Sequence, residues 1–438
     1  MNEFMIRAGT LYDGLGGEPL KNARVLVRGE RIARIESGER SGLDRGRPVL
    51  DARGGVVIPG LVDAHRHVFN CGGFEVGVGV TPLQIARNLS TTVREGVTSI
   101  LDVGGPSFLD MVARAVPRKP RVFRVGSFIA PAGGYPGEWM GRLEFSLGVA
   151  VEARDKKQVR KIVRRMHKKG VAAIKTSVVT RAFDGRPLPT WKGPVLRALC
   201  DEAHSLGLKV GAHVAYPEDY GTAVRCGIDV IHHASAEPMH EEDLHAMAEA
   251  GCILVPTLSL FDVMARGVTE RWVDRPDWRP PVNRALMRSM QRFTEAYERT
   301  AYDDPVPGFY INGPKRMLLR APKMASENTR RFIAAGGKVA LGTDMGLGFL
   351  THGCPARELE MMAECGLSLP GLIRAATGNA AAVFGMDHEL GAIRPGMLAD
   401  ITVLAGDPRK DAAALCSARS VIAGGKVVHG DGPTPPRG

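Results

Sequence analysis

The chain has 438 residues, of which 44% are hydrophobic, and a formal net charge of +11. This length suits one large α/β barrel with an accessory domain, or two or three ordinary domains, and the apolar content argues against global disorder. The seven cysteines are scattered and include no Cys-x-x-Cys pair, which is typical of a reducing compartment. With no signal pattern at the N-terminus and no apolar run of membrane-spanning length, we expect a cytoplasmic protein.

The excess positive charge is densest between Arg154 and Lys169. Apolar residues in this run recur at the spacing of one helix face, and lysine and arginine occupy the other faces. No aromatic residue interleaves with the charges, so the pattern favours a solvated helix over a nucleic-acid patch. We expect a small-molecule substrate, no nucleic-acid or membrane partner, and a homo-oligomer.

The two ends of the chain both predict short β-strands. Residues 5–8, 23–27 and 31–35 are β-branched or apolar runs separated by glycine-containing turns, and residues 399–404 and 420–428 repeat this pattern. We therefore predict a composite β domain, built from residues 1–58 together with residues 391–438.

Between these ends, strands alternate with helices. The strand candidates are residues 56–62, 98–103, 122–128, 172–176, 209–213, 230–233, 253–256 and 338–343, with helices at 81–95, 155–169, 193–206 and 326–335. This order predicts an α/β fold, a parallel (β/α)₈ TIM barrel over residues 59–390. A doubly wound open sheet is the rival, but no glycine-rich phosphate loop follows the first strand.

Residues 261–325 interrupt this alternation and contain Trp272, Trp278 and the Gly308–Tyr310 segment. A long insertion after a late barrel strand lies on the face where barrel chemistry occurs. We interpret it as a lid or substrate wall, with a packing or oligomer element as the equal alternative.

The first barrel strand ends in His65-Arg66-His67. Side chains two apart on a strand point the same way, so both imidazoles project from one face, and imidazole is a common zinc ligand. An isolated His-x-His arises by chance often enough that other ligands are needed to support a metal site.

Later strand ends supply residues of the required type: Lys175, His213, the His232-His233 pair and Asp344. Alternation allows only one of the two adjacent histidines to point inward. A buried lysine tends to lose its charge, and its neutral amine can react with carbon dioxide to give a carbamate. Such a set suits two zinc-like ions bridged by a carboxylate and a hydroxide.

Together these motifs make the chain similar to the metal-dependent amidohydrolase superfamily, and within it to the branch of imidazolonepropionase-like proteins and Xaa-Pro and Xaa-Arg dipeptidases. The resemblance is carried by PGLVDAHRH, AAIKTS, KVGAHV, GIDVIHHAS, LVPTL, ALGTDMG and AATGNAAAVFGMDHELGAIRPGMLADITVL, which extend over nearly the whole chain. It implies a barrel with a small β-sandwich domain from both termini.

The resemblance also implies a role for each ligand. His65 and His67 hold the more buried metal, carbamylated Lys175 bridges the two ions, and His213 and His233 hold the second ion. Asp344 is ligand and catalytic proton shuttle. Zinc is the expected metal, with manganese, iron and cobalt left open.

The chain departs from the branch at three positions. His232 stands where the branch usually has a glutamate, and Tyr135 stands where a loop histidine is common. We take Tyr135, His232 and Tyr216 as candidate substrate contacts. Arg66 should point away from the metals.

The expected activity is hydrolysis of a C–N bond in a small amide, of the dipeptide or N-acyl amino acid type, for which Arg181 and Arg186 are candidate carboxylate partners. Carbamate, urea, lactone or organophosphate hydrolysis on the same site stays open. A mononuclear deaminase would use a glutamate such as Glu218, although Lys175 argues against it. A barrel without metals that acts as a binding subunit is the non-enzymatic alternative.

Overall fold

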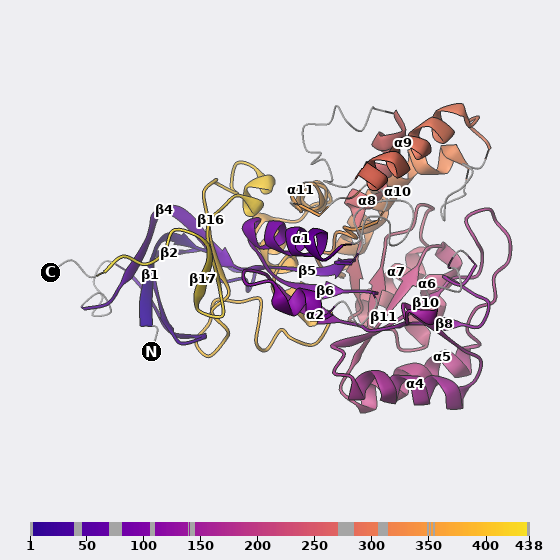
Figure 1. Cartoon of the computed structure of the whole chain (residues 1–438), viewed down its shortest axis with the longest axis horizontal. Coiled ribbons are helices and arrows are strands. Elements are labelled where there is room, and N and C mark those ends of the chain that lie inside the picture. Colours follow the sequence, from indigo (N-terminus) through magenta and orange to yellow (C-terminus); the bar gives the residue numbers. More distant parts are fainter. Residues whose placement is uncertain are drawn as a thin grey trace.

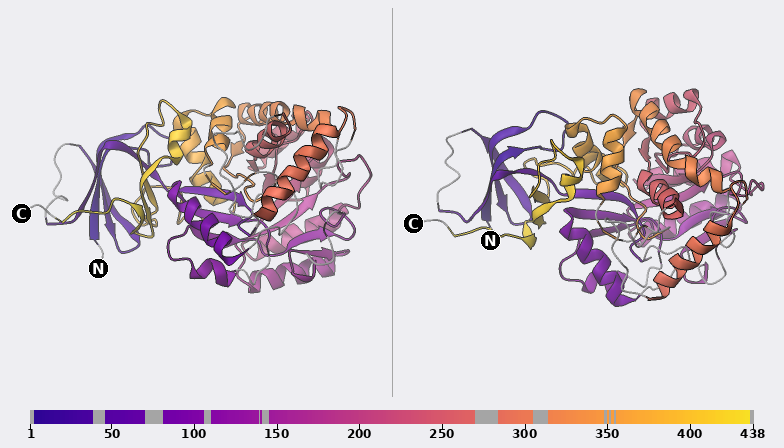
Figure 2. Two further views of the ribbon diagram at one scale, coloured as in Figure 1. Left: turned by 45° about the horizontal axis from the view of Figure 1, so that its top comes forward. Right: turned by 90° about the horizontal axis from the view of Figure 1, so that it is seen from above.

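The computed structural model describes residues 3–38, 46–69, 81–105, 110–138, 140, 145–269, 284–304, 314–347, 350, 352–353 and 355–435. A β domain containing both termini lies at one end of an elongated molecule, and a larger α/β barrel forms the rest (Figure 1). The other views show the same arrangement (Figure 2). This is a TIM barrel joined to a small β-sandwich domain formed by both ends of the chain.

The β domain is one seven-stranded sheet whose order is β17-β16-β15-β4-β1-β2-β3. Side chains from both ends of the sequence, such as Ile6, Val57 and Ile401, share a single core. Its strands are β1 (Glu3–Leu11), β2 (Leu20–Arg28), β3 (Arg31–Ser37), β4 (Val49–Pro59), β15 (Ile401–Leu404), β16 (Ala418–Ala423) and β17 (Lys426–Gly430).

The barrel is built from parallel strands in two ladders, β5-β6-β7 and β14-β13-β12-β11-β10-β8-β9. The ladders join where Ala172 N donates to Arg124 O at 2.8 Å and where Ala64 N donates to Leu341 O at 2.9 Å. The strands are β5 (Leu61–Arg66), β6 (Val97–Asp102), β7 (Arg121–Arg124), β8 (Phe128–Pro131), β9 (Ala150–Ala153), β10 (Ala173–Val178), β11 (Lys209–Val214), β12 (Val230–His232), β13 (Ile253–Val255) and β14 (Lys338–Val339).

Helices follow most of these strands. They are α1 (Pro82–Arg94), α2 (Asp110–Ala115), α4 (Lys156–Lys168), α5 (Gly193–Ser205), α6 (Pro217–Arg225), α7 (Glu241–Glu249), α8 (Leu258–Thr269), α9 (Arg284–Arg299), α10 (Lys315–Ala334), α11 (Ala356–Glu364), α12 (Leu369–Ala375) and α13 (Gly378–Ala382), with a 3₁₀ turn at Ala412–Cys416. None of the described helices is both long enough and apolar enough to cross a bilayer.

The basic helix is arranged as its spacing predicts. Asp155 caps α4 by accepting a hydrogen bond from Gln158 N at 2.8 Å. Val159, Val163 and Met166 are buried, while the lysines and arginines lie on the other faces. The periodicity of the sequence therefore predicted both the helix and its buried side.

Two predicted strands are each divided in the structure. The expected strand 56–62 is the end of β4 and the start of β5, because the chain passes at Gly60 from one domain to the other, with Gly60 N donating to Asp400 O and Leu61 N to Gly96 O. A Cβ at Gly60 would lie 2.3 Å from Thr98 Oγ1, so only glycine fits this crossing. The expected strand 122–128 is likewise interrupted between β7 and β8.

Candidate metal centre

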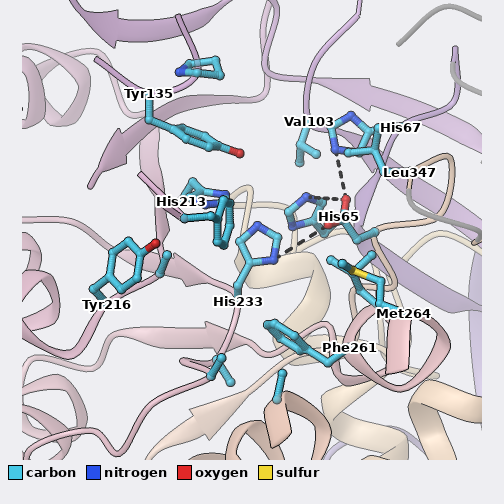
Figure 3. Close-up of a pocket in the computed structure, with 18 of the residues that line it drawn as sticks. His65, His67, Val103, Tyr135, His213, Tyr216, His233, Phe261, Met264 and Leu347 are labelled. Carbon is cyan, nitrogen blue, oxygen red and sulfur yellow. Dashed lines mark ion pairs between the residues drawn. The ribbon is translucent and has the colours of Figure 1, made fainter. Parts of the chain in front are cut away.

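All six predicted ligands line one cavity of about 130 Å³ at the carboxyl ends of the barrel strands. His65 is the last residue but one of β5, Lys175 lies on β10 and His213 on β11, while His67, His233 and Asp344 follow the ends of their strands. Figure 3 shows the histidine rings gathered in the middle of this cavity. Parallel strands bring their carboxyl ends to one rim, so residues far apart in sequence meet here.

His65, His67 and Asp344 form the tightest part of the cluster. One oxygen of Asp344 lies 3.2 Å from His65 Nε2 and 3.1 Å from His67 Nε2. The ligand atoms of these three residues all lie within 4.8 Å of one another, the arrangement of donors around a single metal ion.

His213 and His233 form a second group beside the first. Their ring centroids are 4.4 Å apart, and the His233 ring lies 4.9 Å from that of His65. The second oxygen of Asp344 lies 3.8 Å from His233 Nδ1, so this carboxylate faces both groups.

Two buried nitrogen atoms in the cluster have no hydrogen-bond partner among the described residues: Lys175 Nζ and His213 Nε2. Leaving such atoms unpaired in a protein interior is costly, and in a native structure it calls for an explanation. A group that binds to nitrogen donors would supply the missing partner. The donor set of imidazoles, a carboxylate and an amine thus fits a metal centre.

Burial favours the uncharged form of His65, His213, His233 and Lys175. Burial lowers the pKa of His65 to about 4, although Asp344 opposes the shift. Burial also holds the pKa of His213, His233 and Lys175 well below their ordinary values. Neutral imidazole is the form that binds metals, and neutral amine is the form that reacts with carbon dioxide.

The backbone is strained where the two last ligands stand. His233 has φ +77° and Asp344 has φ +58°, a left-handed conformation that is rare for residues other than glycine. Such strain collects at functional sites and persists because the surrounding contacts impose it. The strained φ at His233 also explains why strand alternation does not apply to the His232-His233 pair.

His232, the residue before this strained position, points into the barrel interior. Its Nδ1 lies 2.9 Å from His65 Nδ1, and its ring packs edge-on against the His65 ring. A Cβ at Gly211 would lie 2.5 Å from His232 Nε2, so the glycine of KVGAHV makes room for this ring. His232 contacts a predicted ligand and is not one of the described residues that line the cavity, so its role as a substrate contact stays a prediction.

Asp63 and Arg66 support the His65 strand from outside the cavity, and Arg66 points away from the cluster as predicted. Arg66 Nε donates to Asp63 at 2.8 Å, and both side chains are fully buried. Asp63 also accepts from the backbone N–H of His65 and from both the N–H and the hydroxyl of Thr343. This carboxylate therefore ties the His65 strand to the segment that carries Asp344.

Thr257 was not foreseen as a functional residue. Its hydroxyl lies 2.9 Å from His233 Nδ1, and its own φ is +52°. It is the threonine of LVPTL, so the family-like motif was the available signal. The next two backbone N–H groups, those of Leu258 and Ser259, donate to the buried carboxylate of Glu358 at 2.9 and 2.6 Å.

The predicted substrate contacts differ in their surroundings. The Tyr135 ring stacks on His213 with centroids 4.1 Å apart, and Tyr216 also lines the cavity. Arg181 pairs with Glu218 and Glu237, and Arg186 pairs with Asp184. Neither arginine is among the described residues of the cavity wall.

The described part of the 261–325 insertion contributes to this wall through Phe261 and Met264 of α8 and Met317, Leu318 and Ala321 of α10. Trp272, Trp278 and the Gly308–Tyr310 segment lie outside the described residues. The geometry thus favours the substrate-wall interpretation for the described helices.

Comparison with known proteins relates this chain to amidohydrolases. Residues 56–428 match the amidohydrolase family model. An uncharacterised protein of Mycobacterium tuberculosis is 26% identical over 382 residues, which are 85% of each chain. An N-acyl-D-glutamate deacylase of Alcaligenes xylosoxydans is 45% identical over 65 residues, 15% of this chain and 12% of that protein. The structure of a Xaa-Pro dipeptidase with bound methionine superposes with a TM-score of 0.76 at 23% identity, covering 97% of this chain and 99% of that one.

The fold and the site therefore define a hydrolase acting on carbon–nitrogen bonds. The chain belongs to the amidohydrolase family.

Proposed function

We propose that this chain is a binuclear metal-dependent amidohydrolase that cleaves the C–N bond of a small amide. The observation that carries the proposal is the meeting of four histidines, a lysine and an aspartate in one cavity, two of them with buried and unpartnered nitrogen atoms. Two divalent ions, zinc first among the candidates, would lower the pKa of a shared water and polarise the substrate carbonyl when bound.

The residues divide between the two ions according to their contacts. His65 and His67, which share one oxygen of Asp344, would hold the first ion. His213 and His233 would hold the second. Lys175, in the same cavity with a neutral amine, would add to carbon dioxide, lose a proton and present the two carbamate oxygens to both ions.

Asp344 is the proposed proton carrier. Its two oxygens face different histidines, which places the carboxylate between the two halves of the cluster. From this position it can accept the proton of the attacking water and deliver it to the leaving amine.

A mononuclear deaminase fits the geometry less well. The glutamate considered for that chemistry, Glu218, pairs with Arg181 and is not among the described residues that line the cavity. Lys175, which that mechanism does not use, lies in the cavity wall.

The five described cysteines are buried free thiols, which supports the further proposal that the protein works in a reducing, cytoplasmic setting.

Metal quantitation together with turnover on dipeptides, N-acyl amino acids and carbamates tests the proposal. We expect close to two ions per chain and release of an amine. Asp344→Asn should lose at least about a thousandfold in kcat while it retains metal, because the proton carrier is lost and the donor oxygen is kept. One ion per chain with release of ammonia would support the deaminase, and turnover like that of the wild type in Asp344→Asn would remove this residue from the mechanism.

A further inference from the structure

The wall of the cavity away from the ligands is apolar. Phe261 and Met264 lie on one side of the histidine cluster and Tyr135 lies on the other (Figure 3). The same wall includes Phe128, Met140, Phe183, Leu260, Met317, Leu318 and Leu347. A substrate bound at the ligands would therefore place its substituents against aromatic and aliphatic side chains, where an apolar group is favoured over a charged one.

The charged side chains near the cavity do not offer a cation to a substrate carboxylate. Of the described residues that line the wall, Lys175 alone has a lysine or arginine side chain, and it belongs to the ligand cluster. Arg181 is already held by two carboxylates, with distances of 2.9 Å to Glu218 and 2.9 Å to Glu237. Because two carboxylates surround one guanidinium, the cluster of Arg181, Glu218 and Glu237 carries a net negative charge. Glu237 itself lines the cavity.

Tyr216 supplies an uncharged polar group instead. Its side chain is buried in the cavity wall, and its hydroxyl has no hydrogen-bond partner among the described residues. The Arg181 guanidinium lies 3.7 Å from the Tyr216 ring centroid and holds the ring in place. The hydroxyl oxygen points toward the neighbouring His213 (Figure 3), so it can donate to a carbonyl bound beside the cluster.

We infer that the substrate of this site is an uncharged amide or carbamate with an apolar substituent, whose polar atoms accept a hydrogen bond from Tyr216. This inference rests on the hydrolase activity proposed above, and it differs from the dipeptide or N-acyl amino acid expected from the sequence, each of which carries a carboxylate. Three separate features favour an uncharged, apolar substrate: the apolar wall, the pairing of Arg181 with two carboxylates, and the unpaired Tyr216 hydroxyl.

A matched pair of substrates tests the inference. Hexanoyl-L-leucine and N-(3-methylbutyl)hexanamide have the same acyl group and the same type of scissile bond, and they differ in one carboxylate. With the metal-loaded enzyme we expect kcat/KM for the uncharged amide to exceed that for the acid by at least about tenfold, because the carboxylate must be desolvated beside Glu237. Equal or faster turnover of the acid would overturn the inference.

Binding to the metal-free chain separates this inference from the proposed activity. Calorimetric titration should show tighter binding of the uncharged amide whether or not it is hydrolysed. If neither compound is hydrolysed while the amide still binds more tightly, the proposed activity fails and the inference on the pocket stands. If the acid binds as tightly as the amide, the inference fails.

Variants of the two polar residues add a second measurement. Glu237→Gln should raise kcat/KM for the acid by about tenfold, because a repulsive charge is removed and Arg181 is partly released. Glu241→Gln, which breaks an exposed ion pair with Arg331, is the matched control and should leave kcat/KM for both substrates unchanged.

Tyr216→Phe should lower kcat/KM for the amide by about fivefold, the effect of one uncharged hydrogen bond. An unchanged acid rate in Glu237→Gln, or an unchanged amide rate in Tyr216→Phe, would contradict the contact concerned.

Discussion

The two halves of the ligand cluster are supported by buried carboxylates of different kinds. In the half around His65, Asp63 is paired with Arg66 and also accepts from Thr343. In the half around His233, Glu358 accepts from the backbone N–H groups of Leu258 and Ser259 and from the Ser259 side chain at the start of α8, and no lysine or arginine of the described chain pairs with it.

This difference in the supporting carboxylates determines how each half responds to substitution and to pH. A buried ion pair is very sensitive to loss of one partner, because the other charge remains in the interior. A buried carboxylate without a cation is instead sensitive to protonation, because burial penalises its charged form. The His65 half should therefore be the less tolerant of substitution, and the His233 half the more sensitive to pH.

The largest effect is expected from Asp63→Asn. It leaves the Arg66 guanidinium buried without its charge partner, which should lower the free energy of unfolding by about 3–5 kcal/mol. Urea denaturation of the metal-free chain measures the change. Asp51→Asn removes one partner of an exposed pair with Arg53 and should cost less than about 1 kcal/mol. Equal losses in the two variants would show that the buried pair has no special weight.

The next effect concerns Glu358 and pH. Burial raises the pKa of this carboxyl from 4.5 to about 7, and the hydrogen bonds from Leu258 N–H and from the backbone and side chain of Ser259 only partly oppose the shift. A raised pKa means that the contribution of Glu358 to stability is complete below about pH 4.5 and is lost as the pH rises through about 7. Relative to Glu358→Gln, which does not titrate, the wild-type chain should lose roughly 3 kcal/mol of stability over this range.

Urea midpoints of both proteins, measured from about pH 5 to about pH 8, give this difference directly. Glu360→Gln, on the same helix but in a half-exposed pair with Arg357, serves as the control. If the difference in stability between the two proteins stays constant, folding does not shift the pKa of Glu358. If the wild-type stability rises with pH relative to Glu358→Gln, the carboxylate is the preferred form in the fold.

The sequence predicted the parts of the site that depend on position along a strand. His65, Lys175 and His213 each lie at or near the carboxyl end of a recognisable apolar run, so the barrel pattern brings them together. The supports come from elsewhere in the chain. Glu358 reaches the start of α8 from a helix about a hundred residues later, and no periodic pattern encodes such a contact.

The sequence also could not predict where a strand stops being regular. Strand alternation allowed one inward-facing histidine at positions 232 and 233, but the positive φ of His233 lets both reach the ligand cluster. Likewise, Arg181 looked available to a substrate carboxylate until its two glutamate partners were seen, because pairing across loops depends on the tertiary fold.

His232 gives the third prediction, a change in metal affinity in the His65 half. If His65 binds metal through Nε2, its Nδ1–H donates to His232 Nδ1, an uncharged acceptor. His232→Leu removes this acceptor and should weaken metal binding at the site around His65 and His67 by about 10–100-fold, or about 1.4–2.7 kcal/mol. His232→Glu supplies an anionic acceptor and should strengthen it. Competition with a chelating dye measures both, with His204→Leu as a surface control. Weaker binding in both variants would indicate a packing role only.

The smallest effect is expected at Thr257, which orients His233 through a single uncharged hydrogen bond. Thr257→Val keeps the β-branched shape at this strained position and removes the hydroxyl, so binding of the second metal should weaken by about 1 kcal/mol, or about fivefold. The site around His65 and His67 should keep its affinity, because Thr257 contacts only the other half. Thr300→Val, which removes a hydroxyl that donates to Ala296 O in the last turn of α9, is the matched control. A loss shared equally by both sites would mean that the two halves respond as one unit, and the contrast between their supports would not extend to metal binding.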